Sequence, residues 1–267
     1  MATLVFFHAH PDDESIATAA TMARAAAEGH RVVLVLATRG EHGEPVPGVL
    51  AEGEQLGVRR SSEVYASADA LGTQRVEFLG YADSGMMGEA TNDVPWSFWQ
   101  ADIDQAAHRL AAILDEERPD VLTIYDDNGA YGHPDHIQVH RVGRRAGQLA
   151  GVPVIVQSTI NRDALRRGMT ERLAQEEAVP DGMKPSDFDE LGKPEELITH
   201  FVDGSAHLAE KRKSMLSHPS QMSEEHFLLA MPDEVFAGSM GTEWYILDDA
   251  SSAQDVGPLA DLFQKMR

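Results

Sequence analysis

The sequence contains no cysteine, which excludes disulfides, thiolate metal sites and a cysteine nucleophile. Any metal ion must therefore be held by histidine, aspartate or glutamate. Basic residues are also scarce, because 22 Lys and Arg stand against 44 Asp and Glu and give a formal net charge of −22. Recognition of phosphate groups requires clustered Lys and Arg. We therefore expect neither nucleic acid nor an anionic membrane as a partner.

Long apolar runs are missing as well. No stretch approaches the roughly 18 consecutive apolar residues of a membrane-spanning helix. The first residues, MATLVFFH, lack a basic segment and do not predict a signal peptide. We accordingly expect a cytoplasmic protein, whereas a homo-oligomer is left open by the sequence.

The pattern of apolar residues predicts the fold class. Over residues 1–160, short apolar runs typical of buried strands alternate with helical segments. This alternation predicts an α/β, Rossmann-like three-layer fold with a mostly parallel central sheet. In such folds the active site lies at the C-terminal ends of the strands.

The whole chain, residues 1–267, is predicted to form a single domain. The expected strands cover 3–7, 31–37, 75–79, 120–125, 152–158 and 243–249, and the expected helices cover 15–28, 55–71, 98–117, 136–150 and 206–217. Residues 161–267 are less regular than the part before them. Within them, the acidic and proline-broken stretch 176–200 predicts a surface excursion or a lid.

Charged side chains crowd the end of the first expected strand, in HAHPDDE at residues 8–14. The acids alone have a structural explanation, because Asp12 or Asp13 would cap the following helix and Glu14 would complement its dipole. That explanation leaves the histidines of the segment unaccounted for. A functional interpretation is therefore needed beside it.

A second segment, GHPDH at residues 132–136, repeats the His-Pro-Asp core after another expected strand. Because parallel strands end at one edge of the sheet, the two segments should meet there. His10, Asp13 and His136 would then form a set of two histidines and one carboxylate. This set suits a catalytic Zn²⁺ ion with an open position for water, and Fe²⁺ is the alternative. Water bound to zinc can have a pKa of about 7.

Other polar residues of the two segments would supply the remaining chemistry. Asp12 lies next to Asp13 and is the expected general base. His133, as an imidazolium, would stabilise the oxyanion and protonate the leaving group. Asp135 would hold His133 in orientation.

HPDDE at 10–14 together with GHPDH at 132–136 resembles the PIG-L/LmbE-like zinc-dependent N-deacetylases. This family includes N-acetylglucosaminyl-phosphatidylinositol de-N-acetylases and the mycothiol-pathway deacetylase and amidase. The resemblance covers residues 1–160 and continues more loosely through KRKSMLSHPSQ at 211–221. It implies the same metal ligands, base and acid, and it adds Tyr131 as a mobile hydroxyl near the oxyanion.

The resemblance also implies contacts with the substrate. Arg60, Asp83 and Glu44 match positions that contact the sugar or polyol in mycothiol-type relatives. The structural alternatives are an ordinary surface arginine for Arg60 and a turn-capping aspartate for Asp83.

Three further histidines stand near these motifs. By strand alternation, His8 is expected beside the metal ligands and not among them. His140, one helical turn after His136, is expected in packing or in support of the ligands. His218, in SHPSQ, stays unassigned.

We expect a metal-dependent amide hydrolase that removes an N-acyl group, in the first place acetyl, from an amino sugar such as an N-acetylglucosaminyl conjugate. One alternative is an amidase that cleaves a mycothiol-type conjugate or another natural-product amide. A non-haem iron(II) oxygenase shares the ligand set but normally occupies a double-sheet barrel. A nucleotide-binding module is disfavoured, because the first turn lacks Gly-x-Gly-x-x-Gly and its acids would repel a pyrophosphate.

Overall fold

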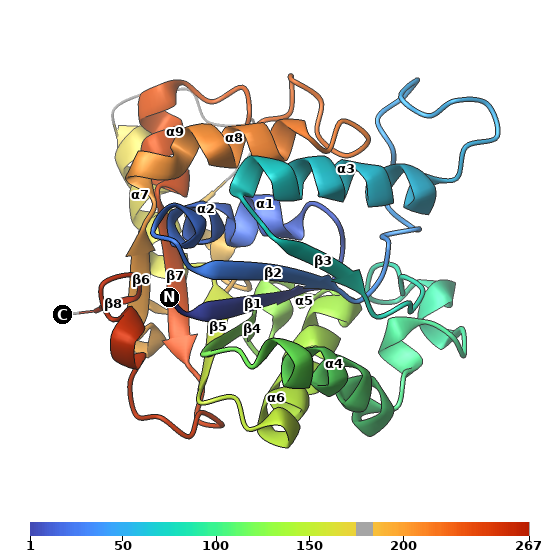
Figure 1. Cartoon of the computed structure of the whole chain (residues 1–267). Coiled ribbons are helices and arrows are strands. Elements are labelled where there is room, and N and C mark those ends of the chain that lie inside the picture. The colour runs from blue at the N-terminus through green and yellow to red at the C-terminus, as the bar shows by residue number, and fades with distance from the viewer. Residues whose placement is uncertain (175–183, 267) are drawn as a thin grey trace.

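A computed structural model describes residues 1–174 and 184–266 of the chain (Figure 1). Its centre is an eight-stranded sheet with the order β3-β2-β1-β4-β5-β7-β6-β8. The strands are β1 (Thr3–His8), β2 (Arg31–Leu36), β3 (Arg75–Phe78), β4 (Val121–Tyr125), β5 (Val154–Thr159), β6 (His200–Asp203), β7 (Thr242–Leu247) and β8 (Gln264–Lys265). The predicted central sheet is thereby confirmed.

The direction of the strands fixes where the site can form. β3, β2, β1, β4 and β5 pair in parallel, whereas β7, β6 and β8 are each antiparallel to their neighbours. β1 pairs with β2 on one side and with β4 on the other. The strand order reverses at this point, and open α/β sheets bind their ligands beyond the carboxyl ends of the strands at such a reversal. The segments that follow β1 and β4 therefore lie next to each other.

Helices cover both faces of the sheet, with α1, α2, α3 and α8 on one side and α4 and α6 on the other (Figure 1). The helices are α1 (Asp13–Ala17), α2 (Ala19–Ala27), α3 (Leu56–Leu71), α4 (Ile103–Glu117), α5 (Gly129–Gly132), α6 (Pro134–Ala150), α7 (Arg162–Ala174), α8 (Leu208–Leu216) and α9 (Asp233–Met240). Short 3₁₀ helices are η1 (Ala90–Asp93), η2 (Phe98–Gln100), η3 (Pro185–Phe188), η4 (Glu195–Leu197), η5 (Ser205–His207) and η6 (Gly257–Leu259). The predicted three layers are therefore confirmed.

The packing of strand β1 explains why its sequence is an unbroken apolar run. Leu4 and Phe6 pack in the core beneath α2 and α3, while Val5 and Phe7 pack in the core beneath α4 and α6. All four side chains are fully buried. Burying each large one contributes roughly 1.5–3 kcal/mol to stability. Successive side chains of β1 point to opposite faces of the sheet, and each face is covered by a core. Both faces of the strand therefore carry apolar residues.

Two of the predicted helices have different boundaries in the structure. The helix expected at 15–28 is divided at Thr18, whose φ of −140° separates α1 from α2. The Thr18 hydroxyl lies 2.8 Å from Nε2 of His8, so the break places a polar partner against the end of β1. The helix expected at 98–117 begins only at Ile103, because Asp102 caps it by accepting from the backbone N–H of Gln105 at 2.9 Å.

The C-terminal part contains elements that the sequence pattern did not indicate, namely β6, β8, α7 and α9. Of the stretch expected to form a lid, 176–183 lies outside the described residues, and 184–200 contains η3, η4 and the first residue of β6. No helix in the described part of the chain is long and apolar enough to cross a membrane.

Gly143 brings α6 close to the sheet and so helps to place the residues at the start of that helix. A Cβ atom there would overlap Cγ2 of Ile124 in β4 and lie 3.4 Å from Phe7 in β1. We expect Gly143→Ala to destabilise the protein by about 1–3 kcal/mol through overpacking, measured by urea unfolding. Gly168→Ala in α7 is the control, because nothing lies within 4 Å of its added Cβ. It should instead stabilise the helix by about 0.5–1 kcal/mol, and equal effects would contradict the packing argument.

Candidate active site

The turn after β1 carries Asp12 in an unusual backbone conformation. Its φ is 103°, in the left-handed region that residues other than glycine rarely adopt. Its side chain makes no capping hydrogen bond, so helix capping does not explain this residue. Asp13, in contrast, accepts from the backbone N–H of His10 at 2.7 Å through Oδ2. The turn therefore presents both carboxylates at the end of β1.

The segment after β4 is held by Asp126. Its Oδ1 accepts from the backbone N–H groups of Asn128 at 3.0 Å and Ala130 at 3.1 Å. Ala130 has a φ of 65°, a second strained residue in this part of the chain. His133 then caps α6, because its Nδ1 accepts from the backbone N–H of Asp135 at 3.1 Å. The local structure thus orders the whole second motif.

The two turns bring the predicted metal ligands together. Oδ1 of Asp13 lies 3.3 Å from Nε2 of His136, and its Oδ2 lies 3.5 Å from Nδ1 of His10. His10 and His136 are 6% and 3% exposed. Ring nitrogens of His10, His133 and His136 also lie within 4.8 Å of one another. His133, the predicted acid, is therefore close enough to be a ligand as well.

The carboxylate of Asp135 has a different partner from the one predicted. It lies 3.1 Å from Nε2 of His10 and accepts from the backbone N–H and the hydroxyl of Ser84. The expected pairing of this carboxylate with His133 is wrong, because His133, as the cap of α6, faces the backbone N–H of Asp135 instead. Asp135 thus orients His10, in the pattern by which carboxylates support ligating histidines.

The charges around His10 favour a bound cation. Burial alone would lower the pKa of His10, but hydrogen bonds to Asp13, Asp135 and Asp83 raise it well above its usual value. The same carboxylates attract a divalent ion. The carboxylate of Asp13 lies between ring nitrogens of His10 and His136, and a donor set of two histidines and one carboxylate fits Zn²⁺ or Fe²⁺. The residues present therefore fit the predicted metal.

Asp83 also lies beside His10, with Oδ1 at 3.5 Å from Nε2. Atoms of His10, Asp83 and Asp135 come within 4.8 Å of one another, which would also allow an ion there. Both carboxylates already accept hydrogen bonds, however. Asp83 accepts from the backbone N–H of Gly85, and Asp135 accepts from that of Ser84. Asp83 thus caps a turn, as the structural alternative to substrate binding predicted, and it also lies next to His10 of the site.

Arg60 is not a surface residue, because it is only 3% exposed. One of its terminal nitrogens lies 3.1 Å from Oδ1 of Asp12 and also bonds the carbonyl of Pro11. The other donates to the carbonyl of Gly40 at 2.8 Å. Burial raises the pKa of Asp12, and the positive charge of Arg60 opposes that rise. The guanidinium therefore holds the carboxylate that was predicted to be the base.

We expect Arg60→Ala to lower kcat by about 10- to 100-fold, since a hydrogen bond between charged groups contributes about 1.5–3 kcal/mol. Arg60→Lys is the control, because it keeps the charge and loses the fork that reaches Asp12 and Pro11 together. Steady-state kinetics and melting temperatures of both variants would check this. A raised KM with unchanged kcat would instead support the substrate contact that the resemblance implies.

The structure places Tyr131 and Glu44 very differently. The Tyr131 hydroxyl lies 3.3 Å from Nε2 of His136, and the residue is 43% exposed, so it borders the site from the solvent side. Glu44 is exposed, and among the described residues no hydrogen bond or ion pair joins its side chain to the site. Glu41, which sequence reasoning missed, accepts from the backbone N–H of Asp83 at 3.1 Å.

Tyr125, at the end of β4, was also missed. Its ring stacks on His136 with the centroids 4.5 Å apart. Its hydroxyl lies 2.6 Å from Nδ1 of His8, and its carbonyl lies 2.9 Å from Nδ1 of His140. His8 and His140 therefore lie behind the ligands, as predicted. The position of Tyr125 at a strand end was the signal that could have found it.

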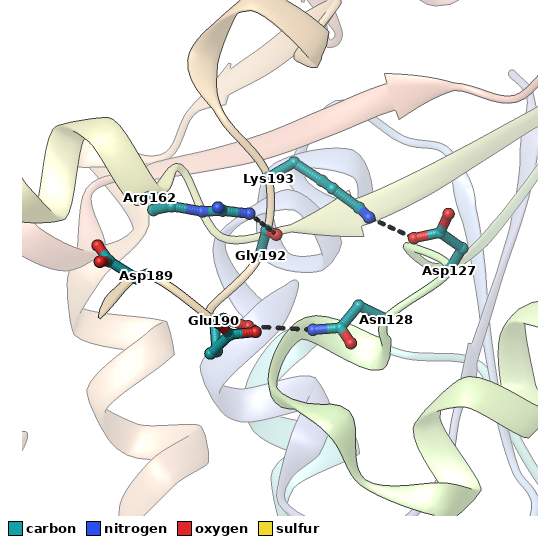
Figure 2. Close-up of a pocket in the computed structure, with 7 residues that line it drawn as sticks. All are labelled: Asp127, Asn128, Arg162, Asp189, Glu190, Gly192 and Lys193. Atoms are coloured by element: carbon teal, nitrogen blue, oxygen red, sulfur yellow. Dashed lines mark hydrogen bonds and ion pairs between the residues drawn. The ribbon is translucent and has the colours of Figure 1, made fainter. Parts of the chain in front are cut away.

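A polar pocket of about 360 Å³ adjoins the turn that carries Tyr131 (Figure 2). It is lined by Asp127, Asn128, Arg162, Asp189, Glu190, Gly192 and Lys193. The backbone N–H of Gly192 donates to the carbonyl of Ala130 at 2.6 Å, and Lys193 forms an ion pair with Asp127. The segment before β6 is thus attached to the turn at 127–130, just before GHPDH. The irregular sequence of that segment did not predict this contact.

The family model PIG-L, described as GlcNAc-PI de-N-acetylase, matches residues 5–147, more than half of the chain. The chain belongs to the PIG-L family. It is 42% identical over 263 residues to the 1D-myo-inositol 2-acetamido-2-deoxy-α-D-glucopyranoside deacetylase of Thermobifida fusca, with 91% of this chain and 92% of that relative covered. A deacetylase of the same name from Geodermatophilus obscurus is 39% identical over 284 residues, with 97% and 96% covered.

A solved structure supports the fold of this PIG-L protein. The N,N′-diacetylchitobiose deacetylase of Pyrococcus horikoshii superimposes with a TM-score of 0.61 at 20% identity, covering 97% of this chain and 88% of that one. The predicted family and fold are confirmed. The PIG-L protein is a hydrolytic N-deacetylase, which agrees with the predicted hydrolase and not with an oxygenase.

Proposed function

We propose that this PIG-L enzyme removes the acetyl group of 1D-myo-inositol 2-acetamido-2-deoxy-α-D-glucopyranoside and releases acetate and a free amine. The observation that carries the proposal is the convergence of Asp12, Asp13, His10 and His136 at the ends of β1 and β4. The two inositol-sugar deacetylases that match nearly the whole chain support this choice of substrate.

We assign the metal to His10, Asp13 and His136, with Zn²⁺ as the first choice and Fe²⁺ as the alternative. When bound, zinc would polarise the amide carbonyl and lower the pKa of a water molecule to about 7. Asp135 keeps His10 in orientation through Nε2, which leaves Nδ1 facing Asp13. The chain therefore presents these residues just beyond the ends of β1 and β4.

Asp12 takes the proton from the attacking water, because its carboxylate is held by Arg60 and carries no capping bond. His133 has its Nδ1 occupied by the backbone N–H of Asp135, so its Nε2 is free to donate to the carbonyl oxygen. Burial and the neighbouring His10 and His136 lower the pKa of His133 to about 3. To protonate the departing amine, His133 must take up a proton as negative charge develops on the substrate.

Hydroxyl groups of the substrate would be bound beside these residues. Asp83 faces the site and forms, with Glu44, the substrate-binding set that we propose, whereas Arg60 acts through Asp12. Tyr131 lies in α5, which directly follows Asn128 of the polar pocket, and its hydroxyl is close to His136. The pocket offers both donors and acceptors, which suits the hydroxyls of a polyol ring.

The test is acetate release from N-acetylglucosamine, its inositol conjugate and mycothiol-type conjugates, before and after chelation and after adding back Zn²⁺ or Fe²⁺. We expect the highest kcat/KM with the inositol conjugate, loss of activity on chelation and recovery with one of the metals. Preferential cleavage of the amide in the mycothiol-type conjugate would show an amidase instead. Absence of acetate from every substrate at one metal per chain would contradict the proposal.

A further inference from the structure

A buried pair of ionisable side chains, Glu14 and His218, lies directly behind the site and has no part in the mechanism above. Oε1 of Glu14 is 2.6 Å from Nε2 of His218, and both side chains are fully buried. The hydroxyl of Ser67 donates to the same oxygen at 2.6 Å, and that of Ser15 does so at 3.2 Å. Such a pair is costly to bury, so its position calls for an explanation.

The other oxygen of Glu14 reaches the predicted base. Oε2 accepts the backbone N–H of Asp12 at 3.0 Å, and Asp12 is the residue with a φ of 103°. A strained residue of this kind persists only where its surroundings determine it. Here Glu14 holds the backbone of Asp12, while Arg60 holds its carboxylate and the carbonyl of Pro11. Two buried side chains thus hold the partly buried Asp12, one through its backbone and the other through its carboxylate.

His218 is itself fixed by the segment that contains it. The backbone N–H and hydroxyl of Ser220 both bond Glu63 in α3, at 3.1 and 2.5 Å. The carbonyl of Ser220 accepts from Val46 in the loop after β2, at 2.8 Å. SHPSQ, which carries the unassigned His218, is therefore anchored to α3 and to the loop after β2.

We propose that Glu14 and His218 are positioning residues that hold Asp12 in its left-handed conformation and so aim its carboxylate at the attacking water. The inference rests on the proposed role of Asp12 as the base. Neither residue touches the substrate in this scheme, and each acts through the backbone N–H of Asp12. The charged pair gives Glu14 one fixed orientation, so that Oε2 stays on that N–H group.

Glu63 provides a matched control. It is also a buried carboxylate, 5% exposed, and it holds the same segment through Ser220. Among the described residues it makes no hydrogen bond to Asp12. If the pair only stabilised the fold, removing the charge of either carboxylate would have the same kinetic consequence.

The experiment compares Glu14→Gln and Glu63→Gln, each alone and combined with Asp12→Asn, by kcat, KM, metal content and melting temperature. We expect Glu14→Gln to lower kcat by about 10- to 100-fold, as a small misplacement of a catalytic group does, with KM and metal content unchanged. Glu63→Gln should change kcat by less than about twofold, because the amide can still accept from the backbone N–H of Ser220 and donate to its hydroxyl oxygen, which keeps the segment anchored. On the Asp12→Asn background, Glu14→Gln should have almost no further effect, because residues that act through one group are not additive.

Equal losses of kcat in Glu14→Gln and Glu63→Gln, or an undiminished effect of Glu14→Gln on the Asp12→Asn background, would overturn the proposal. If Asp12→Asn alone retained full kcat, Asp12 would not be the base. This outcome distinguishes a failure of the proposed function from a failure of the positioning role of Glu14 and His218. Should Glu14→Gln not fold, His218→Leu takes its place in the same cycle, since leucine cannot donate to Glu14.

Discussion

Asp12→Asn should leave one metal ion bound per chain and lower kcat by about 10²- to 10⁴-fold, the range expected for loss of a general base. Asparagine has the shape of aspartate but cannot accept a proton at neutral pH. The backbone contact with Glu14 involves the N–H of residue 12 and survives the change. Metal analysis of the purified variant, together with acetate release from the inositol conjugate, measures both outcomes.

Asp13→Asn is the matched control for this experiment, because the two aspartates are adjacent and face the same site. Asp13 contacts His10 and His136, whereas Asp12 contacts Arg60. We expect Asp13→Asn to lose the metal as well as the activity. Loss of the metal in Asp12→Asn with its retention in Asp13→Asn would mean that base and ligand have been exchanged.

His136→Ala and His133→Ala should separate metal binding from proton transfer. We expect His136→Ala to lose both metal and activity, because its Nε2 faces Asp13 at 3.3 Å. His133→Ala should keep the metal and lower kcat by about 10²- to 10⁴-fold with little change in KM. Nδ1 of His133 already accepts a hydrogen bond as the cap of α6, which favours a role for His133 outside the ligand set.

His140→Ala serves as the control for these two variants. It lies on the same helix and is also buried, but its Nδ1 contacts the carbonyl of Tyr125. Within residues 1–174 and 184–266, it belongs to neither group of candidate ligands. We expect it to keep the metal and to lose only stability. Loss of the metal in His133→Ala, together with its retention in Asp13→Asn, would instead establish a site of three histidines, which the 4.8 Å spacing allows.

The sequence by itself determined most of the parallel core and the location of the site. Strands β1, β2 and β4 are buried on both faces, so most of their residues are apolar and appear as short apolar runs. The two His-Pro-Asp segments each follow such a strand, and parallel strands end at one edge. The absence of cysteine limits any metal ligand to histidine, aspartate or glutamate.

Only the tertiary structure decided which polar partners these residues have. Asp135 supports His10 across 125 residues of sequence, and Glu14 meets His218 across 204. Arg60, which looked like a surface residue or a substrate contact, is folded onto Asp12 from another helix. Hydrophobic periodicity and capping signals report contacts within one element. Pairings between buried polar groups depend on how distant elements pack, so no local pattern in the sequence encodes them.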